Sequence, residues 1–429
     1  MNLQDKIQDK TAVIGVLGLG YVGLPIAVAF AEAGYTVKGF DILPHRVDAI
    51  NRGESYIADI PSARLGAVVD RINATTDFSR IRAVDAVIIC VPTPLTKSKD
   101  PDLSYVVSTA ETISKNLQRG QLVVMESTTY PGTTREVLQP ILERSGMKAG
   151  QDFFLGYSPE RIDPGNTRHS LRDTPKLVAG INDESARLAE TLYHQIIDHV
   201  VPVSSPEVAE LTKIFENVFR SVNIALVNEL ALLCRKIGID VWEVIEAASS
   251  KPFGYMPFRP GLGVGGHCIP LDPYYLASKA KEYDFHTRFI ELAAEINEQM
   301  PHHITSWIME ALNQRGVSLH GAAVFVLGAS YKKDIGDIRE SPSLKLIHLL
   351  REKGADVVYN DPYVPEITIG GETLSSVDLS DERLRSADCV VIATDHSDYD
   401  YASIVADSKL VFDTRGATKG LDKPGVIRL

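Results

Sequence analysis

Cysteine is scarce in this chain, which has four cysteines among 429 residues, at positions 90, 234, 268 and 389. Four thiols so far apart do not form the disulfide framework of a small secreted protein. None of them has the Cys-x-x-Cys spacing of a structural zinc site, so we expect no metal. Neither disulfides nor zinc are therefore expected to hold this fold together.

Basic residues are in the minority, with 44 Lys and Arg against 56 Asp and Glu and a net charge of −12. Nucleic-acid and membrane-surface binders are usually basic, so we expect neither partner. The opening residues MNLQDKIQDKTAVIG lack the basic and apolar regions of a signal peptide, and no apolar run reaches the ~18 residues that span a bilayer. We expect a cytoplasmic protein of two or three domains.

The first ~200 residues alternate short apolar runs, rich in β-branched side chains, with longer helical patterns. This alternation is typical of a parallel sheet covered by helices. A helix is expected over 23–34. Strands are expected at 13–17, 36–40, 86–91, 122–126, 153–157 and 176–179.

The pattern changes at Ser205, where a helix of about thirty residues begins and runs to Gly238. A second helical stretch covers 288–314, and a Pro/Gly-rich loop is expected between them over 251–273. A loop that long is commonly functional. Residues 205–315 are thus expected to form a helical middle region.

The C-terminal part repeats the order of the opening. AAVFVLGASYKK resembles AVIGVLGLGYVG, VVYNDPYVP resembles VKGFDILP, and ADCVVIATDH resembles VDAVIICVPT. The second copy keeps Gly328 but lacks the glycine triplet. We therefore predict an α/β protein with two Rossmann-like, doubly wound parallel-sheet domains, at 1–204 and 316–429, joined by the helical region.

A dinucleotide site is indicated by Gly18, Gly20 and Gly23, which follow one expected strand and open a helix. The glycines permit a tight turn, a close approach of a pyrophosphate and helix–strand packing. Asp41 ends the next strand, 23 residues after Gly18, where a carboxylate favours the ribose of NAD over a 2′-phosphate. Arg46 lies close enough to Asp41 to bear on that preference. We expect NAD; a glycine-rich turn in an unrelated α/β domain is the alternative.

Cys268 differs from the other three cysteines, which fall in expected strands or the long helix and are interpreted as packing residues. It lies in GVGGHCIPLDP, beside His267 and four residues before Asp272. Backbone N–H groups exposed by the glycines could favour its thiolate. A catalytic thiol and an incidental loop cysteine both remain open on this evidence.

Lys213, Asn217 and Arg220 share one face of the long helix. A solvated polar stripe is the ordinary explanation for such spacing. Neighbouring positions, including Leu211, Phe215 and Leu226, are apolar, so we expect much of this helix to be buried. Buried charges need a partner or a ligand.

The motifs GLGYVGLP, ESTTYPGTT, SPERIDPGN, KIFENVFRSVNIALVNE, GVGGHCIPLDP and YKKDIGDIRESPS occur in this order along the chain. Together they resemble the UDP-glucose/UDP-mannuronate dehydrogenase family over essentially the whole length. That resemblance implies an enzyme that oxidises the C6 hydroxyl of a UDP-sugar to a carboxylate with two NAD+, through a thiohemiacetal and a thioester on a cysteine. It also implies an N-terminal NAD domain, a central dimerisation region and a C-terminal UDP-sugar domain, assembled as a homodimer or a higher homo-oligomer.

The resemblance assigns roles to individual positions. Its catalytic residues match Cys268, Asp272 as the carboxylate that orients water, Lys213 and Asn217 at developing oxyanions, Glu160 in thioester hydrolysis and Thr128 as a hydroxyl holding the water. Its cofactor contacts match Gly18, Gly20, Tyr21, Val22, Gly23, Asp41, Arg46, Thr93, Thr128 and Arg339. Its substrate contacts match Glu160, Arg161, Lys213, Asn217, Arg220, Arg259, Gly265, Tyr331, Lys332 and Arg415.

The sugar is indicated by finer features. His267 and Leu271 stand where the glucose branch has serine and lysine, and HCIPLDP with FRSVNIALVNEL resembles the N-acetylhexosamine branch. PTPLT, KPFGYMPF and FHTRFIELAAEIN are most similar to the UDP-N-acetylglucosamine enzymes of bacterial O-antigen and capsule synthesis. UDP-N-acetylmannosamine, UDP-N-acetylgalactosamine and UDP-glucose remain alternatives. So do a two-electron hydroxyacid-type dehydrogenase and a non-catalytic nucleotide-sugar-binding protein.

Overall fold

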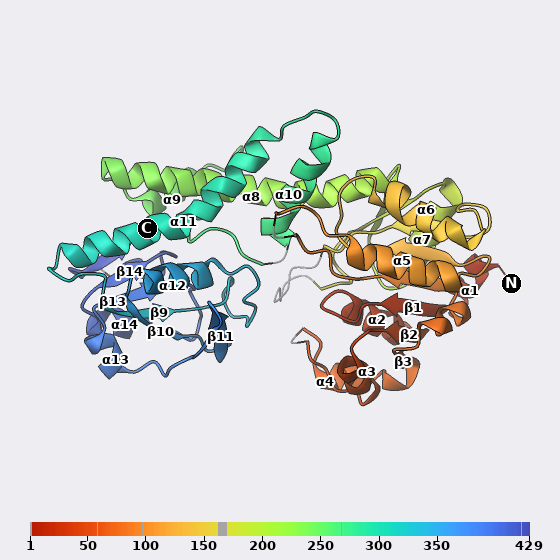
Figure 1. The fold of residues 1–429 in the computed structure, drawn as a ribbon, viewed down its shortest axis with the longest axis horizontal. Helices are drawn as coiled ribbons and strands as arrows, with labels where there is room; N and C mark the ends of the chain where they lie inside the picture. The colour runs from red at the N-terminus through yellow and green to blue at the C-terminus, as the bar shows by residue number, and fades with distance from the viewer. Residues whose placement is uncertain (1, 58, 97, 162–169, 267, 422) are drawn as a thin grey trace. The chain divides into compact units, whose positions relative to one another are not determined.

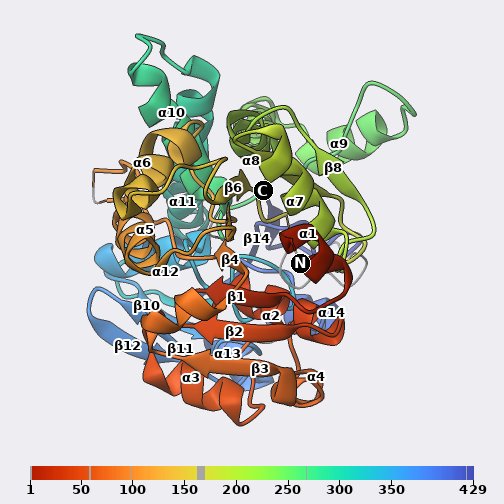
Figure 2. The same cartoon turned by 90° about the vertical axis from the view of Figure 1, so that its right-hand side faces the viewer.

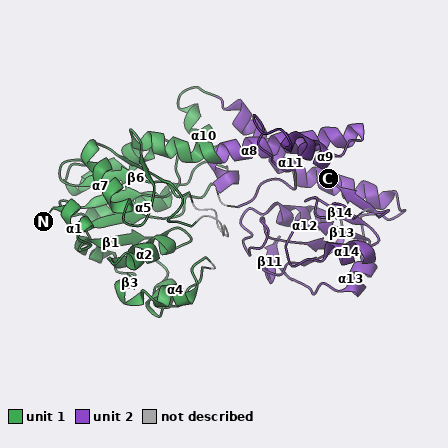
Figure 3. Cartoon of the chain, turned by 180° about the vertical axis from the view of Figure 1, so that it is seen from behind, with its two compact units in different colours: residues 1–216, 274–285 green, residues 217–273, 286–429 purple. Residues whose placement is uncertain are grey.

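The structure is a computed structural model that describes residues 2–57, 59–96, 98–161, 170–266, 268–421 and 423–429. It divides into two compact units: residues 1–216 with 274–285, and residues 217–273 with 286–429 (Figure 3). The division falls within two helices, α8 (Pro206–Ile237) and α10 (Cys268–Lys281). Each unit is described by itself.

The first unit is built on an eight-stranded sheet of order β3-β2-β1-β4-β5-β6-β7-β8. Its strands are β1 (Val13–Leu17), β2 (Thr36–Phe40), β3 (Ile72–Thr75), β4 (Ala86–Ile89), β5 (Leu122–Met125), β6 (Phe154–Tyr157), β7 (Lys176–Gly180) and β8 (Val200–Pro202). All six expected strands are confirmed, with ends within two residues. Strands β3 and β8 were not expected. The β6–β7 pair is antiparallel, so the sheet is not wholly parallel.

Helices cover both faces of this sheet because strand side chains alternate between them. Ile14, Val16 and Ile88 join one core with α2 and α7, whereas Leu17, Val87 and Ile89 join the other with α5 and α6. The helices are α1 (Leu3–Gln8), α2 (Gly23–Glu32), α3 (Pro44–Asn51), α4 (Ser62–Gly66), α5 (Ser104–Asn116), α6 (Gln139–Leu142) and α7 (Asp183–Tyr193), with the π-helical η3 (Thr133–Leu138) and the 3-10 turns η1 (Val69–Arg71), η2 (Phe78–Ala83) and η4 (Glu143–Ser145). Helices α3 and α4 lie by the β3 edge (Figures 1 and 2).

The second unit contains a five-stranded parallel sheet of order β10-β9-β13-β14-β15, with helices on both faces, and a separate hairpin β11–β12. Its strands are β9 (Ala323–Leu327), β10 (Asp356–Asn360), β11 (Glu366–Ile369), β12 (Glu372–Ser375), β13 (Cys389–Ile392), β14 (Val411–Asp413) and β15 (Val426–Arg428). Its remaining helices are α9 (Val241–Ser249), α11 (Arg288–Asn313), α12 (Pro342–Glu352), α13 (Asp381–Ser386) and α14 (Tyr401–Asp407). The predicted fold class, two doubly wound α/β sheets with a long helix, is confirmed.

Two expectations for the helices need correction. The loop expected over 251–273 ends earlier, because α10 begins at Cys268. Helix α8 is also less buried than expected: Leu211, Phe215 and Leu226 are exposed, the last two by more than 60%. By length and composition α8 could cross a membrane, and 44% of its most apolar window is buried inside the protein.

Candidate functional site

The turn after β1 needs glycine at two of its three glycine positions for reasons internal to the chain. Gly18 has a positive φ of +88°, and a Cβ there would lie 2.6 Å from the carbonyl oxygen of Cys90. A Cβ on Gly23 would lie 1.9 Å from the carbonyl oxygen of Gly18. Larger residues at these two positions would therefore displace backbone.

Gly20 is different, because a Cβ added there would meet no atom within 4 Å. The chain itself does not require glycine at this position, and the space beside it is open. Helix α2 begins next to it without a side-chain cap and without an acidic residue in its first turn. Backbone N–H groups and the positive end of a helix dipole bind phosphate, so this turn fits the pyrophosphate of a dinucleotide.

Asp41 follows β2 and is buried against the same turn. Its carboxylate accepts hydrogen bonds from the N–H groups of Leu19 and Leu43, each at 3.0 Å. The Arg46 guanidinium lies 3.6 Å from Oδ2 of Asp41, the oxygen that accepts from Leu19, and it also lies over the ring of Tyr56. The structure thus brings Asp41 and Arg46 together beside the glycine turn, and Asp41 also holds that turn in shape.

The second sheet repeats this arrangement around Asp361. Its carboxylate accepts from the N–H groups of Ala329 at 2.7 Å and Ser330 at 3.0 Å, in the turn after β9. Gly328 also has a positive φ, of +92°, and its N–H donates to Asn360 as that of Gly18 donates to Phe40. The predicted internal repeat is confirmed at the level of hydrogen bonds.

Three further predicted residues lie at the carboxyl ends of β4, β5 and β6, on the edge where Gly18 lies. Thr93 is buried and its carbonyl accepts from the Tyr275 hydroxyl at 2.7 Å. Thr128 is partly exposed in the loop after β5, which Ser127 ties to the β4 loop by donating to Val91. Glu160 follows β6. In a doubly wound sheet this edge is where ligands bind.

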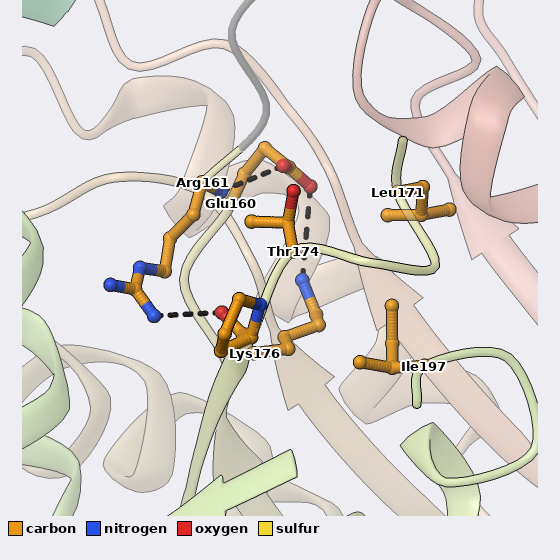
Figure 4. Close-up of a pocket in the computed structure, with 7 residues that line it drawn as sticks. Glu160, Arg161, Leu171, Thr174, Lys176 and Ile197 are labelled. Carbon is orange, nitrogen blue, oxygen red and sulfur yellow. Dashed lines mark hydrogen bonds and ion pairs between the residues drawn. The ribbon is translucent and has the colours of Figure 1, made fainter. Parts of the chain in front are cut away.

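Glu160 and Arg161 are held by protein partners (Figure 4). The Arg161 guanidinium donates to both carboxylate oxygens of Glu216 in α8, at 2.7 and 3.3 Å, and to the carbonyl of Pro175. Glu160 accepts from the Arg161 N–H at 2.7 Å and lies 3.7 Å from the ammonium of Lys176. Residues 162–169, which include the rest of the SPERIDPGN motif, lie outside the described residues, as does His267.

Helix α8 carries three predicted residues, of which Lys213 and Asn217 are buried and Arg220 is exposed. The Asn217 side-chain amide donates to the Asp272 carboxylate at 2.5 Å. Asp272 is buried one turn after Cys268 in α10, so the two lie on one face of that helix. The second unit therefore brings together Asn217, Asp272 and the helix turn that begins with Cys268.

Several of the predicted substrate residues of the second unit lie near the turn after β9. A Cβ on Gly265 would lie 2.5 Å from the Cβ of Tyr331, so the loop that contains Arg259 and Gly265 packs directly on the segment of Tyr331 and Lys332. The Gly266 N–H donates to the Arg339 carbonyl at 2.9 Å.

Two arginines border this group. The Arg415 guanidinium donates to the carbonyls of Ala393 and Tyr331. These carbonyls orient the guanidinium but do not neutralise its charge. Arg339 is held instead by the carboxylate of Asp337, two residues earlier.

Sequence reasoning missed several buried polar groups. Glu126 and Lys176 form an ion pair of 2.8 Å inside the first unit, and Glu210 in α8 accepts from the N–H groups of Gly132 and Thr134. Asn228 anchors the 259–266 loop through the N–H of Gly261. For Glu210 and Asn228, a charged or amide residue inside a largely apolar helix was the available signal.

Three models of one family match the chain in order: the NAD binding domain at 12–197, the central domain at 207–299 and the UDP binding domain at 325–420 of the UDP-glucose/GDP-mannose dehydrogenase family. The chain belongs to that family. It is an NAD-dependent nucleotide-sugar dehydrogenase, as its motifs indicated, and NAD is its cofactor.

Individual relatives are similar over most of their length. The chain is 38% identical over 389 residues to UDP-N-acetyl-D-mannosamine dehydrogenase from Pyrococcus horikoshii, covering 90% of each chain. It is 39% identical over 357 residues to UDP-N-acetyl-D-glucosamine 6-dehydrogenase from Pseudomonas aeruginosa, covering 83% and 84%. A solved structure of the Pyrococcus horikoshii UDP-D-ManNAc dehydrogenase matches with a TM-score of 0.88 at 37% identity, over 97% of this chain and 98% of that one.

The other cysteines of this family member have the surroundings of packing residues. Burial raises the pKa of Cys389 to about 12 and raises the pKa of Cys90 well above its usual value. Such thiols stay protonated and are poor nucleophiles. Among the described residues, no group of three or more His, Cys, Asp or Glu side chains could hold a metal ion.

Proposed function

We propose that this enzyme oxidises the C6 hydroxyl of UDP-N-acetyl-D-glucosamine to the carboxylate of UDP-N-acetyl-D-glucosaminuronate, with two NAD+ per product. The observation that carries the proposal is the hydrogen bond between Asn217 and Asp272, one helical turn from Cys268. A two-electron dehydrogenase has no use for a thiol in that place, whereas a four-electron oxidation must retain its aldehyde between two steps.

In this proposal the Cys268 thiolate adds to the aldehyde carbon and forms a thiohemiacetal. Removal of a hydride then gives a thioester, and water releases the carboxylate and restores the thiol. NAD+ supplies the hydride acceptor for both oxidations. Lys213 and Asn217 stabilise the oxyanions. Asp272, Glu160 and Thr128 orient the water.

The remaining roles follow the division expected from the sequence. Residues 1–204 hold NAD through the glycine turn, Asp41, Arg46, Thr93 and Thr128, and residues 316–429 hold the UDP-sugar. Arg415, with its guanidinium oriented by carbonyls, offers charge to the diphosphate. Residues 205–315 carry the thiol and join two copies. We place the enzyme in the cytoplasm and its product in bacterial surface polysaccharide.

Self-association is supported by the exposed side of α8. Leu211, Phe215, Phe219, Leu226 and Leu233 follow helical spacing and are each more than 40% exposed. An apolar stripe of this length on one helix is typical of a surface that another protein covers, and we propose that a second copy covers it. Sedimentation velocity should show a dimer or larger assembly, and Phe215→Glu should shift it towards the monomer. Monomeric wild type at micromolar concentration would contradict the proposal.

The sugar is tested by NADH formation with UDP-N-acetylglucosamine, UDP-N-acetylmannosamine, UDP-N-acetylgalactosamine and UDP-glucose under one set of conditions. We expect the highest kcat/KM with UDP-N-acetylglucosamine. A higher kcat/KM with another sugar would reassign the substrate, and activity with UDP-glucose alone would overturn the N-acetylhexosamine assignment. Binding of a UDP-sugar without NADH under any condition would favour the non-catalytic alternative.

A further inference from the structure

Beneath Glu160, the first unit contains a buried cluster of one cation and two carboxylates. Lys176 projects from β7, and its side chain is 4% exposed. Its ammonium lies 2.8 Å from Glu126 and 3.7 Å from Glu160, and it donates to the carbonyl of Pro159 at 3.3 Å. Figure 4 shows Lys176 pointing from the strand towards Glu160.

The surroundings explain why this lysine stays charged. Burial by itself would lower the pKa of Lys176, but the charges of Glu126 and Glu160 outweigh it and raise that pKa. Glu126 is fixed on its other oxygen by the Tyr193 hydroxyl, which donates to it. Burial raises the pKa of Glu126, and the neighbouring Lys176 ammonium opposes that shift. Lys176 therefore has the hydrogen-bonded Glu126 side chain on one side and Glu160 on the other.

The two oxygens of Glu160 have different partners. Oε1 accepts from the Arg161 N–H at 2.7 Å, which fixes it to its own loop. Oε2 lies at ion-pair distance from Lys176. A small pocket lies beside Glu160 and Lys176 and is lined by both residues, with Thr174 and Pro175 (Figure 4). Without the cation, the carboxylates of Glu126 and Glu160 would repel each other in a poorly solvated place, and Glu160 would move away.

We propose that Lys176, supported by Glu126, is a positioning residue that holds the Glu160 carboxylate oriented for hydrolysis of the Cys268 thioester. This inference rests on the proposed function, in which Glu160 acts at that step. In the hydrolysis, water adds to the thioester carbonyl and Glu160 accepts one of its protons; the C–S bond then breaks, the second proton passes to the Cys268 sulfur and restores the thiol, and the carboxylate of the product forms. Lys176 exchanges no proton and touches no substrate.

Lys176→Met tests the inference, because methionine keeps the length of the side chain and removes its charge. We expect steady-state kcat to fall by about 10²-fold, as for a displaced catalytic group, while the first NADH burst and NAD affinity stay at wild-type values. Intact-protein mass spectrometry should then detect a UDP-uronosyl thioester on Cys268. A wild-type kcat without adduct, or a loss of the first burst in a folded protein, would overturn the inference.

Glu160→Gln, measured in parallel, separates this inference from the function on which it rests. If Glu160→Gln accumulates the thioester and Lys176→Met does not, only the role of Lys176 is wrong. If neither variant accumulates it, the assignment of Glu160 in the proposed function fails.

Should Lys176→Met fail to fold, Glu126→Gln decides. This variant keeps the shape of the Glu126 side chain but removes the charge that holds the Lys176 ammonium in place. It should also lower kcat and accumulate the thioester on Cys268. A wild-type kcat without the adduct would contradict the role of Lys176.

Discussion

Gly20 offers a direct test of the cofactor turn, because the fold of the chain does not require a glycine at this position. A Cβ at Gly20 meets no protein atom within 4 Å, and its backbone does not have a positive φ. Gly20→Ala should therefore leave the free energy of unfolding unchanged or raise it by about 0.4–1 kcal/mol, by restricting the unfolded chain. The same methyl group would occupy the space that we assign to the pyrophosphate. We expect NAD to bind at least about tenfold more weakly, a loss of about 1.4 kcal/mol.

Gly23→Ala is the matched control. Its Cβ would lie 1.9 Å from the Gly18 carbonyl oxygen, a backbone atom that cannot move without distorting β1 or α2. Overpacking of this kind costs about 1–3 kcal/mol or more, so this variant should lose stability before NAD is added. Thermal unfolding without ligand and calorimetric titration with NAD separate the two effects. Wild-type NAD affinity in folded Gly20→Ala would refute the placement of the pyrophosphate.

Three further predictions concern other parts of the molecule. Burial raises the pKa of Glu210 from 4.5 to about 7, so the folded protein keeps a proton that the unfolded chain has released. As the pH rises from 4.5 to 7, the free energy of unfolding should therefore fall by about 3 kcal/mol. Urea titrations of Glu210→Gln should lack this pH-dependent contribution. Asp361→Asn should cost about 1–3 kcal/mol at pH 7, because an amide N–H would face the N–H of Tyr363 or those of the β9 turn, and an unchanged urea midpoint would contradict this. Cys268→Ser should abolish the acid product, and near-normal turnover would support a two-electron enzyme instead.

Most of the strands that sequence reasoning located in the first unit are apolar on both sides of the sheet, although β2, with sequence TVKGF, is not. In β4 and β5 every residue is buried, and each forms a continuous apolar run bounded by polar residues. Strand β3, with sequence INAT, lies at the sheet edge and exposes alternate positions, and β8 has three residues. Such short segments carry too little pattern to be recognised. The antiparallel direction of β7 relative to β6 is set by tertiary pairing, which composition does not record.

The parts of the site that follow from local backbone geometry could be predicted from sequence motifs. The parts that depend on tertiary packing were harder to predict. Gly18 and Gly23 are required by steric contacts within the turn, and their spacing was visible in the sequence. Cys268 was expected in a loop because CIPLDP contains two prolines. The first turn of a helix tolerates proline, since its N–H groups have no helical partner, and α10 continues through Pro273.

Lys176 escaped notice because its partners are far along the chain. It lies 50 residues from Glu126 and pairs with it only once β5 and β7 have joined one sheet. Within β7 it stands as the first residue of an otherwise apolar strand, which is an unremarkable place for a lysine. Only tertiary structure shows that its side chain points inwards.

The central claim is a four-electron oxidation through Cys268, and its stoichiometry tests it most directly. UDP-N-acetylglucosamine should be consumed to completion in excess NAD+, with NADH measured by absorbance and the sugar nucleotide by chromatography. The account predicts about two NADH per UDP-sugar and a uronate product. One NADH per sugar, with a free aldehyde or ketone as the product, would contradict it.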